Sequence, residues 1–157
     1  MKKNKQLWIL TGLVVLMTAF IFSNSFKGSA HSTADSDSII AWIQPVVRWI
    51  FGEDHNINLH FWVRKTAHLC EFALLGGLTT GLLITWKAGK NRYFRGYEFF
   101  YVLAVAVVDE FIQSFTGRTS SVKDVLLDFT GALLGFCAVW LIHKRINKKR
   151  KANNDGN

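Results

Sequence analysis

Residues 105–135 read VAVVDEFIQSFTGRTSSVKDVLLDFTGALLG, two apolar segments joined by a short polar turn. Acidic residues lie on both sides of the turn, at positions where hydrophobic residues would be expected. Ionisable groups within a membrane segment are costly, and they usually mark a ligand, a pathway or a partner. This stretch therefore predicts two membrane helices that carry a polar site near the end where they are joined.

The composition is that of a polytopic membrane protein. Half of the 157 residues are hydrophobic, and several apolar runs approach the ~20 residues that a spanning helix needs. The net charge of +8 could suggest nucleic acid, but the basic residues gather beside apolar segments, at both ends and in the middle of the chain. Such clusters anchor membrane helices on the cytoplasmic side. We therefore expect an all-α membrane helix bundle and no nucleic-acid partner.

The chain is expected to form one membrane domain over residues 1–157 with about four transmembrane helices. The expected spans are residues 7–25, 64–86, 97–115 and 124–143, followed by a basic cytoplasmic tail over 144–157. The first segment also has features of a secretory signal peptide, but its length favours a retained helix. The basic clusters place both termini inside, and they place residues 26–60 and the turn at 116–122 outside.

Residues 26–60 contain a polar part followed by an apolar part. The polar part, KGSAHSTADSDS, is expected to be flexible. From Ile39 to Phe51, aromatic and branched residues surround Pro45, the only proline, in a stretch too short to span a membrane. This pattern fits either a short interfacial helix lying on the membrane or a loop packed over the bundle.

Polar side chains from the last three spans are expected at one depth. At ~1.5 Å per residue, His68 and Glu71 lie roughly 5–10 Å below the outer surface. The following two spans bring polar residues to the same depth, and the inner half has nothing comparable. The candidate site, which we call the polar layer, comprises Arg64, His68, Glu71, Asp109, Glu110, Gln113, Arg118, Asp124 and Asp128.

The residue types of the polar layer suit catalysis or anion binding. The candidate catalytic acids and bases are Glu71, His68, Asp109 and Glu110. The candidate ligand-binding residues are Arg64, Gln113, Arg118, Asp124 and Asp128. The fork of Arg118 matches phosphate or carboxylate oxygens, and the outer starts of two spans add helix dipoles that favour an anion. His68 and the acids could also hold a divalent ion, but no fixed metal motif is present, and we expect neither a metal nor a cofactor.

Several of these residues also have a structural interpretation. Ser121 and Asp124 fit the S-x-x-D pattern of a helix cap. Lys65 can extend its charge to the membrane interface. His68 and Glu71 can form a hydrogen-bonded pair that ties helices together.

Two glycine pairs predict close helix contacts. Gly131 and Gly135 continue the polar face of the last span as a GxxxG pattern, and Gly77 and Gly81 form a similar pair in the second span. Glycines at this spacing let two helix backbones approach each other closely. We therefore expect these faces to contact other helices and not lipid.

Two blocks of the sequence resemble the VanZ-like family of bacterial membrane proteins. Residues 64–76, RKTAHLCEFALLG, are similar to the family pattern R-K-x-A-H-x-x-E-Y-x-x-L-G. Residues 109–135 are similar to a second family block, which begins D-E-x-x-Q and runs through G-R to G-x-x-x-G. This chain departs from the family at Phe72, where tyrosine is usual, and at Asp128, which often corresponds to asparagine.

The resemblance implies a small helical protein linked to low-level resistance to teicoplanin-type glycopeptide antibiotics. It implies a multi-pass location in a bacterial cell membrane, which agrees with the basic clusters that place both termini in the cytoplasm. The family's signature positions correspond to His68, Glu71, Asp109, Glu110, Gln113, Arg118 and Asp124.

Three functions fit these observations. The leading one is a protein that binds or modifies a cell-envelope lipid or peptidoglycan precursor and so lowers glycopeptide binding at the cell surface. The second is a hydrolase or transferase that acts on a lipid-linked headgroup. The third is a structural protein whose polar layer is an ion-pair network that links helices or holds another membrane protein.

Overall fold

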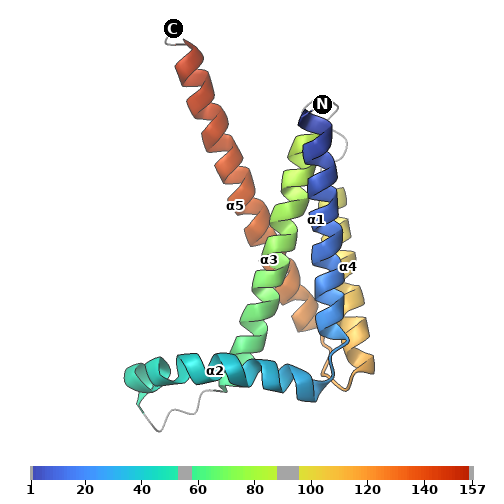
Figure 1. Cartoon of the computed structure of the whole chain (residues 1–157), viewed down its shortest axis with the longest axis vertical. Coiled ribbons are helices and arrows are strands. Elements are labelled where there is room, and N and C mark those ends of the chain that lie inside the picture. Colours follow the sequence, from blue (N-terminus) through green and yellow to red (C-terminus); the bar gives the residue numbers. More distant parts are fainter. Residues whose placement is uncertain (1, 53–57, 88–95, 156–157) are drawn as a thin grey trace.

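The computed structural model describes residues 2–52, 58–87 and 96–155, and this part of the chain forms five helices and no strand. The helices are α1 (Lys2–Ser25), α2 (Ser29–Phe51), α3 (Leu59–Lys87), α4 (Tyr97–Phe115) and α5 (Val122–Asp155). Helices α1, α3, α4 and α5 form the bundle, and α2 lies across one end of it (Figure 1). The predicted all-α helix bundle is confirmed.

Three of the described helices are long and apolar enough to cross a membrane. The spans are Asn4–Ser25 in α1, Leu59–Trp86 in α3 and Val122–Asn153 in α5. Helix α4, expected as a further span, has 19 residues and carries Glu98, Asp109 and Glu110. Helix α4 contacts α1, α3 and α5, and this packing buries Asp109 and Glu110 among the helices.

Some helix boundaries differ from the prediction. Helix α3 begins at Leu59, and α5 continues to Asp155, so the basic tail expected after residue 143 is helical. Helix α5 diverges from the bundle along its second half, and this tail is largely exposed (Figure 1). The start of α1 and the end of α5 lie at one end of the bundle, and the α4–α5 turn and α2 lie at the other.

Helix α2 has 23 residues, so the prediction of a short helix after a flexible polar stretch was wrong. In the polar half, serine hydroxyls donate to carbonyls one turn earlier, as where the Ser36 hydroxyl donates to the carbonyl of Ser32 at 2.9 Å. The helix ends at Gly52, whose φ of 82° stops it and whose N–H donates to the carbonyl of Arg48.

One face of α2 is apolar and exposed. Trp42 is 86% exposed and Trp49 is 85% exposed, and Ile39, Val46 and Ile50 lie beside them. Their spacing of three and four residues places them on one side of the helix. An exposed apolar face of this kind is typical of a helix that lies on a membrane surface.

Helices α3 and α5 pack most closely, and glycines make the contact possible. A Cβ atom on Gly135 would lie 1.8 Å from the carbonyl oxygen of Ala73, and one on Gly131 would lie 2.4 Å from that of Leu69. Cβ contacts shorter than 3.0 Å essentially never occur, so only glycine fits at these positions. The predicted GxxxG contact of α5 is confirmed.

The matching glycine on α3 is Gly76, and the sequence interpretation missed it. A Cβ atom on Gly76 would lie 2.2 Å from the carbonyl oxygen of Ala132. By contrast, a Cβ atom on Gly77 would meet the Val139 side chain at 3.3 Å and the carbonyl oxygen of Gly135 at 3.7 Å, and Gly81 has no neighbour nearer than 3.9 Å. The close contact therefore uses one residue before the predicted pair.

Candidate functional site

A polar pocket of about 320 Å³ lies where α3 begins, α4 ends and α5 begins. Seven of the nine residues of the polar layer line it, namely Arg64, His68, Glu110, Gln113, Arg118, Asp124 and Asp128. Asp109 lies behind His68, and Glu71 points to a different neighbour. Three helices that are separated in the sequence therefore bring most of the candidate residues into one cavity.

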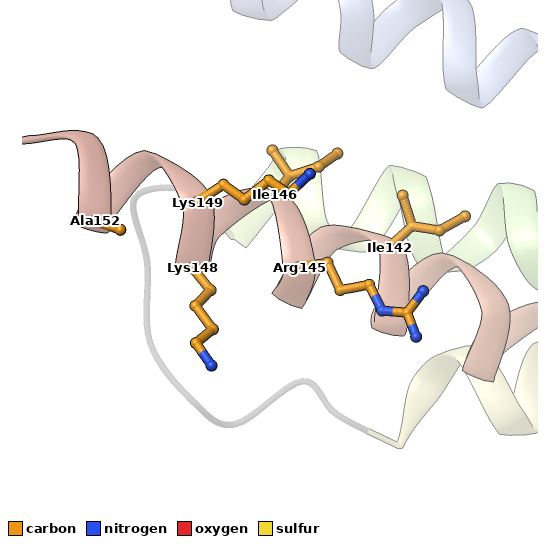
Figure 2. Close-up of a pocket in the computed structure, with 6 residues that line it drawn as sticks. All are labelled: Ile142, Arg145, Ile146, Lys148, Lys149 and Ala152. Atoms are coloured by element: carbon orange, nitrogen blue, oxygen red, sulfur yellow. The ribbon is translucent and has the colours of Figure 1, made fainter.

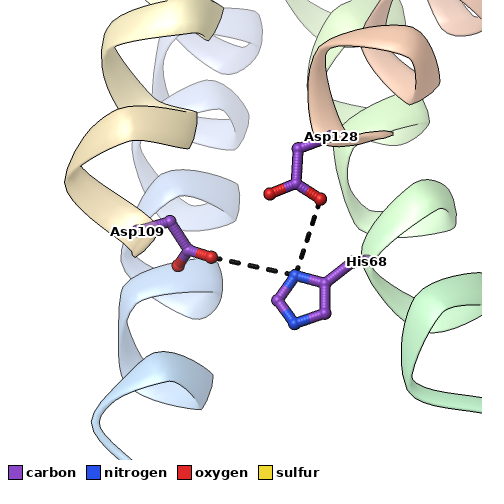
Figure 3. Close-up of side chains that lie close together, drawn as sticks. All are labelled: His68, Asp109 and Asp128. Atoms are coloured by element: carbon purple, nitrogen blue, oxygen red, sulfur yellow. Dashed lines mark ion pairs between the residues drawn. The ribbon is translucent and has the colours of Figure 1, made fainter. Parts of the chain in front are cut away.

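His68 lies at the centre of this cluster. Its Nε2 atom is 3.2 Å from Nη2 of Arg118, and its Nδ1 atom is 3.7 Å from carboxylate oxygens of both Asp109 and Asp128 (Figure 3). An arginine can only donate, so Nε2 accepts and a neutral imidazole carries its proton on Nδ1. The N–H group of His68 is therefore directed toward two buried carboxylates.

The two aspartates have different surroundings. Asp109 accepts hydrogen bonds from the Ser25 hydroxyl of α1 and from Nε2 of Gln113, the latter at 2.8 Å. Asp128 is 1% exposed, and neither of its carboxylate oxygens has a hydrogen-bond partner among the described residues. Asp109 is thus held by hydrogen bonds, whereas Asp128 makes none with the described residues and lies close to His68 and to the Asp109 carboxylate.

Glu71 links α3 to α1. It accepts a hydrogen bond from Nδ2 of Asn24 at 2.9 Å and does not line the pocket. The predicted hydrogen bond between His68 and Glu71 does not form, because each side chain has another partner. The geometry therefore favours a structural role for Glu71 over the predicted catalytic one.

Glu110 helps to cap the start of α5. The N–H of Ser121 donates to the Glu110 carboxylate at 3.0 Å, and the N–H of Asp124 donates to the Ser121 hydroxyl at 3.3 Å. Half of the predicted capping box therefore forms, and Glu110 of α4 completes it in place of the Asp124 carboxylate. These backbone donors are already satisfied, so anion binding at this helix start is less favourable than the sequence suggested.

The cations of the pocket fall into two groups. Lys65 pairs with Asp124. Arg64 and Arg118 have no carboxylate within 4.0 Å among the described residues. Burial, and then the charge of Arg64, lower the pKa of Arg118 from its usual value, but an arginine remains protonated at neutral pH. The pocket therefore holds two guanidinium groups without a direct salt bridge to a described residue, although the charges of Asp109, Glu110 and Glu71 act on Arg118 from further away.

The sequence interpretation missed the contribution of α1. Asn24 and Ser25 bond the acids of α3 and α4, and the hydroxyl of Thr116 donates to the carbonyl of Ser25 at 3.2 Å. The available signal was the stretch SNS, three polar residues directly after an apolar run. The expected first span, residues 7–25, ends with these three residues and assigns them no contact.

A second hollow, about 420 Å³ in volume, lies beside the C-terminal half of α5. Its described lining residues are Ile142, Arg145, Ile146, Lys148, Lys149 and Ala152, which extend from one helix (Figure 2). Because a single helix supplies them, these residues do not form a converging polar site like the one around His68.

Comparison with known proteins gives one family. The chain matches the family described as VanZ/LLP1 over residues 7–143. No curated protein and no solved structure matches it. The family match covers α3 and α4 entirely, most of α1 and α5, and every residue of the polar layer. The protein is a membrane protein with apolar helices, and it belongs to the VanZ/LLP1 family.

Proposed function

We propose that the polar pocket binds the anionic headgroup of a cell-envelope lipid or a lipid-linked peptidoglycan precursor. The observation that carries this proposal is the presence of Arg64 and Arg118 in one pocket without a carboxylate partner. Like charges gathered in a partly buried site repel each other unless an anion lies between them. A phosphate or carboxylate would supply that charge.

Arg118 supports this ligand class through its geometry. One end of its guanidinium group, Nη2, donates to His68, and the Nε–H group is buried without an acceptor among the described residues. An unpaired buried donor is unfavourable by about 1–3 kcal/mol. An oxyanion satisfies such a donor, and the planar fork of arginine suits phosphate and carboxylate oxygens better than lysine does.

The position of the pocket also favours a lipid-linked ligand. The pocket is at the end of the bundle where α2 lies, and α2 exposes the apolar face that includes Trp42 and Trp49. If α2 lies on the membrane, the pocket is near the headgroups of that leaflet. The basic N- and C-terminal segments lie at the opposite end, which favours the cytoplasmic side for them and the outer leaflet for the pocket.

Such a site accounts for a role in glycopeptide resistance. A protein that holds or alters a precursor at the outer leaflet lowers the number of precursors that an antibiotic can reach. Membrane lipids or the precursor are then the direct partners, and no second protein is required.

The test compares wild type with Arg64→Gln and Arg118→Gln in a glycopeptide-sensitive Gram-positive host. Arg48→Gln, in the exposed part of α2, is the matched control because it removes the same charge outside the pocket. At equal membrane levels, we expect wild type and the control to lower teicoplanin susceptibility and bound fluorescent teicoplanin, and the pocket variants to lose both effects. Lipids that copurify with each protein are measured by mass spectrometry. Equal lipid retention by all four proteins would contradict the proposal.

A second candidate is a membrane enzyme that acts on the same headgroup. His68 favours it, because its imidazole lies in the pocket and its Nδ1 faces the buried carboxylate of Asp109, which is a common arrangement for a general base. The test is His68→Gln with analysis of the cellular lipids. An enzyme predicts that wild type changes the lipid composition and that the variant does not, and an unaltered composition excludes the enzyme while leaving the binding proposal intact.

A further inference from the structure

One nitrogen and two oxygen atoms from three helices converge beside the polar pocket. They are Nδ1 of His68, a carboxylate oxygen of Asp109 and one of Asp128, and all three lie within 4.8 Å of one another (Figure 3). Both aspartates are buried, with exposed fractions of 0% and 1%. Because α3, α4 and α5 each contribute one group, the arrangement depends on the fold and not on local sequence.

Two of the three groups, those of His68 and Asp128, lack the partners that buried polar groups normally have. Nδ1 of His68 and both carboxylate oxygens of Asp128 are buried without a hydrogen-bond partner in the described part of the chain. No described lysine or arginine nitrogen lies within 4.0 Å of the Asp109 or Asp128 carboxylate. Buried charges are normally paired or bound to a metal, since isolation from water is otherwise very unfavourable. A metal ion between the two carboxylates would supply the positive charge that the described residues do not.

We propose that His68, Asp109 and Asp128 bind a divalent transition-metal ion. One imidazole and two carboxylates suit zinc, manganese or cobalt, whereas calcium and magnesium prefer oxygen ligands alone. Such an ion lies ~2.0–2.2 Å from each ligand, so neighbouring ligands in a tetrahedral site are about 3.4 Å apart. The two His68–aspartate distances are 3.7 Å, so a small movement of side chains brings the atoms to binding distance.

The surrounding residues are arranged as supports for a metal site. Ser25 and Gln113 hold Asp109 by hydrogen bonds, as groups behind metal ligands commonly do. His68 and Asp128 also line the polar pocket, so the remaining coordination positions are open to water or to an anion bound there. The metal site and the anion pocket are neighbours, but different residues carry each.

Metal binding changes the hydrogen bond between His68 and Arg118. An ion at Nδ1 takes the lone pair of that atom, so the imidazole proton moves from Nδ1 to Nε2 without a net gain or loss. Protonated Nε2 no longer accepts from Arg118. Arg118 is then free to turn its Nη2 group toward an anion in the pocket, and metal binding strengthens anion binding there.

The structure changes which acids are candidates for ligands. Sequence reasoning considered Glu71, Glu110 and Asp124 together with His68 and expected no metal. Each of those three acids has another partner, in Asn24, the Ser121 backbone and Lys65 respectively. Asp128, which had been assigned to ligand binding, takes their place.

The test uses the full-length protein purified in detergent, with any affinity tag removed and metals stripped by a chelator. Zinc, manganese and cobalt ions are added separately, and bound metal is measured by equilibrium dialysis with elemental analysis. We expect about one ion per chain for wild type with at least one of these metals and, for cobalt, a visible absorption spectrum of nitrogen and oxygen ligation. Less than stoichiometric binding of all three ions by the wild type would overturn the proposal.

Two variants and two matched controls identify the site. Asp128→Asn and His68→Gln should each weaken binding by at least about 10-fold, because each removes one ligand. Asp37→Asn and His60→Gln, an acid and a histidine that lie 3.6 Å apart outside the three proposed ligands, should bind as wild type does. Helical circular dichroism and elution volume show which variants are folded, and two ligand variants allow for the failure of one. Wild-type affinity in a folded ligand variant, or an equal loss in the controls, would place the metal elsewhere.

Discussion

Replacement of Gly135 by alanine should separate the two helices that carry most of the polar pocket. The new Cβ atom would lie 1.8 Å from the carbonyl oxygen of Ala73 and 2.9 Å from the backbone nitrogen of Gly77. Both obstacles are backbone atoms of α3, so no side-chain rotation relieves the contact. The backbones must separate by roughly 1 Å, the difference between 1.8 Å and the 3.0 Å that Cβ contacts require.

The expected effect of Gly135→Ala on stability is large for the addition of one methyl group. Overpacking a well-packed contact typically destabilises by about 1–3 kcal/mol, and a clash with backbone belongs at the upper end. For a chain of this length, 3 kcal/mol corresponds to a fall in melting temperature of about 6–12 °C. The loss exceeds the small gain in helix propensity from glycine to alanine, about 1 kcal/mol.

The assay is thermal unfolding of the detergent-purified protein, followed by fluorescence-detected gel filtration. Two glycines provide matched controls for the same change. Gly12→Ala in α1 adds a methyl group with nothing within 4 Å, and Gly77→Ala meets a movable Val139 side chain at 3.3 Å and the carbonyl oxygen of Gly135 at an ordinary 3.7 Å. We expect wild-type or higher stability for Gly12→Ala, an intermediate loss for Gly77→Ala and the largest loss for Gly135→Ala. Equal melting temperatures for Gly135→Ala and Gly12→Ala would refute the close packing of α3 and α5.

Three further predictions concern single contacts. Ser25→Ala removes a hydrogen bond to buried Asp109, so we expect a loss of about 1–3 kcal/mol in unfolding free energy, measured by thermal or denaturant unfolding. Glu110→Gln keeps an acceptor for the α5 cap and should remain close to wild type, whereas Glu110→Ala should lose about 0.5–2 kcal/mol in the same assay. Trp42→Ala combined with Trp49→Ala removes the two most exposed aromatic groups of α2, so we expect α2 to bind liposomes less strongly, measured as reduced protection of α2 backbone amides from hydrogen exchange in liposomes.

Each of these predictions has an outcome that contradicts it. Wild-type stability of Ser25→Ala would show that Asp109 does not depend on α1. Equal destabilisation by the two Glu110 variants would show that the charge of Glu110 contributes more to stability than its hydrogen bond to the Ser121 N–H. Unchanged amide protection of α2 after loss of both tryptophans would show that contacts with the bundle protect α2, and not binding to the membrane.

The sequence predicted which residues lie at one depth but not which neighbour each one faces. His68 and Glu71 are separated by three positions, so they lie on nearly the same side of α3. The first faces α4 and α5, and the second faces α1, because the boundary between these neighbours falls between the two side chains. Helix periodicity does not show where one neighbouring helix ends and the next begins around α3. The sequence therefore could not predict that Glu71 lies outside the pocket.

The glycine contact and α2 show two other limits of sequence reasoning. The spacing of Gly131 and Gly135 was sufficient to predict a contact face, but the partner glycine on α3 depends on the crossing geometry, which selects Gly76. In α2, serine and aspartate favour loops and helix caps when isolated. Contacts with α3 and hydrogen bonds within the helix compensate for that preference, and neither is visible in local sequence.

The pairing of α3 with α5 has a consequence for membrane insertion, since α4 lies between them in the chain. A nascent chain delivers α3 to the membrane first, and Glu71 can at once bond Asn24 of the helix already present. His68 must wait for partners that are synthesised later, Asp109 in α4 and Asp128 in α5. A chain that stops before residue 122 lacks Asp128 and every contact of α5, so polar groups of α3 and α4 that α5 would cover remain exposed at an energetic cost within the membrane. Insertion of the last helix completes the cluster and removes that cost.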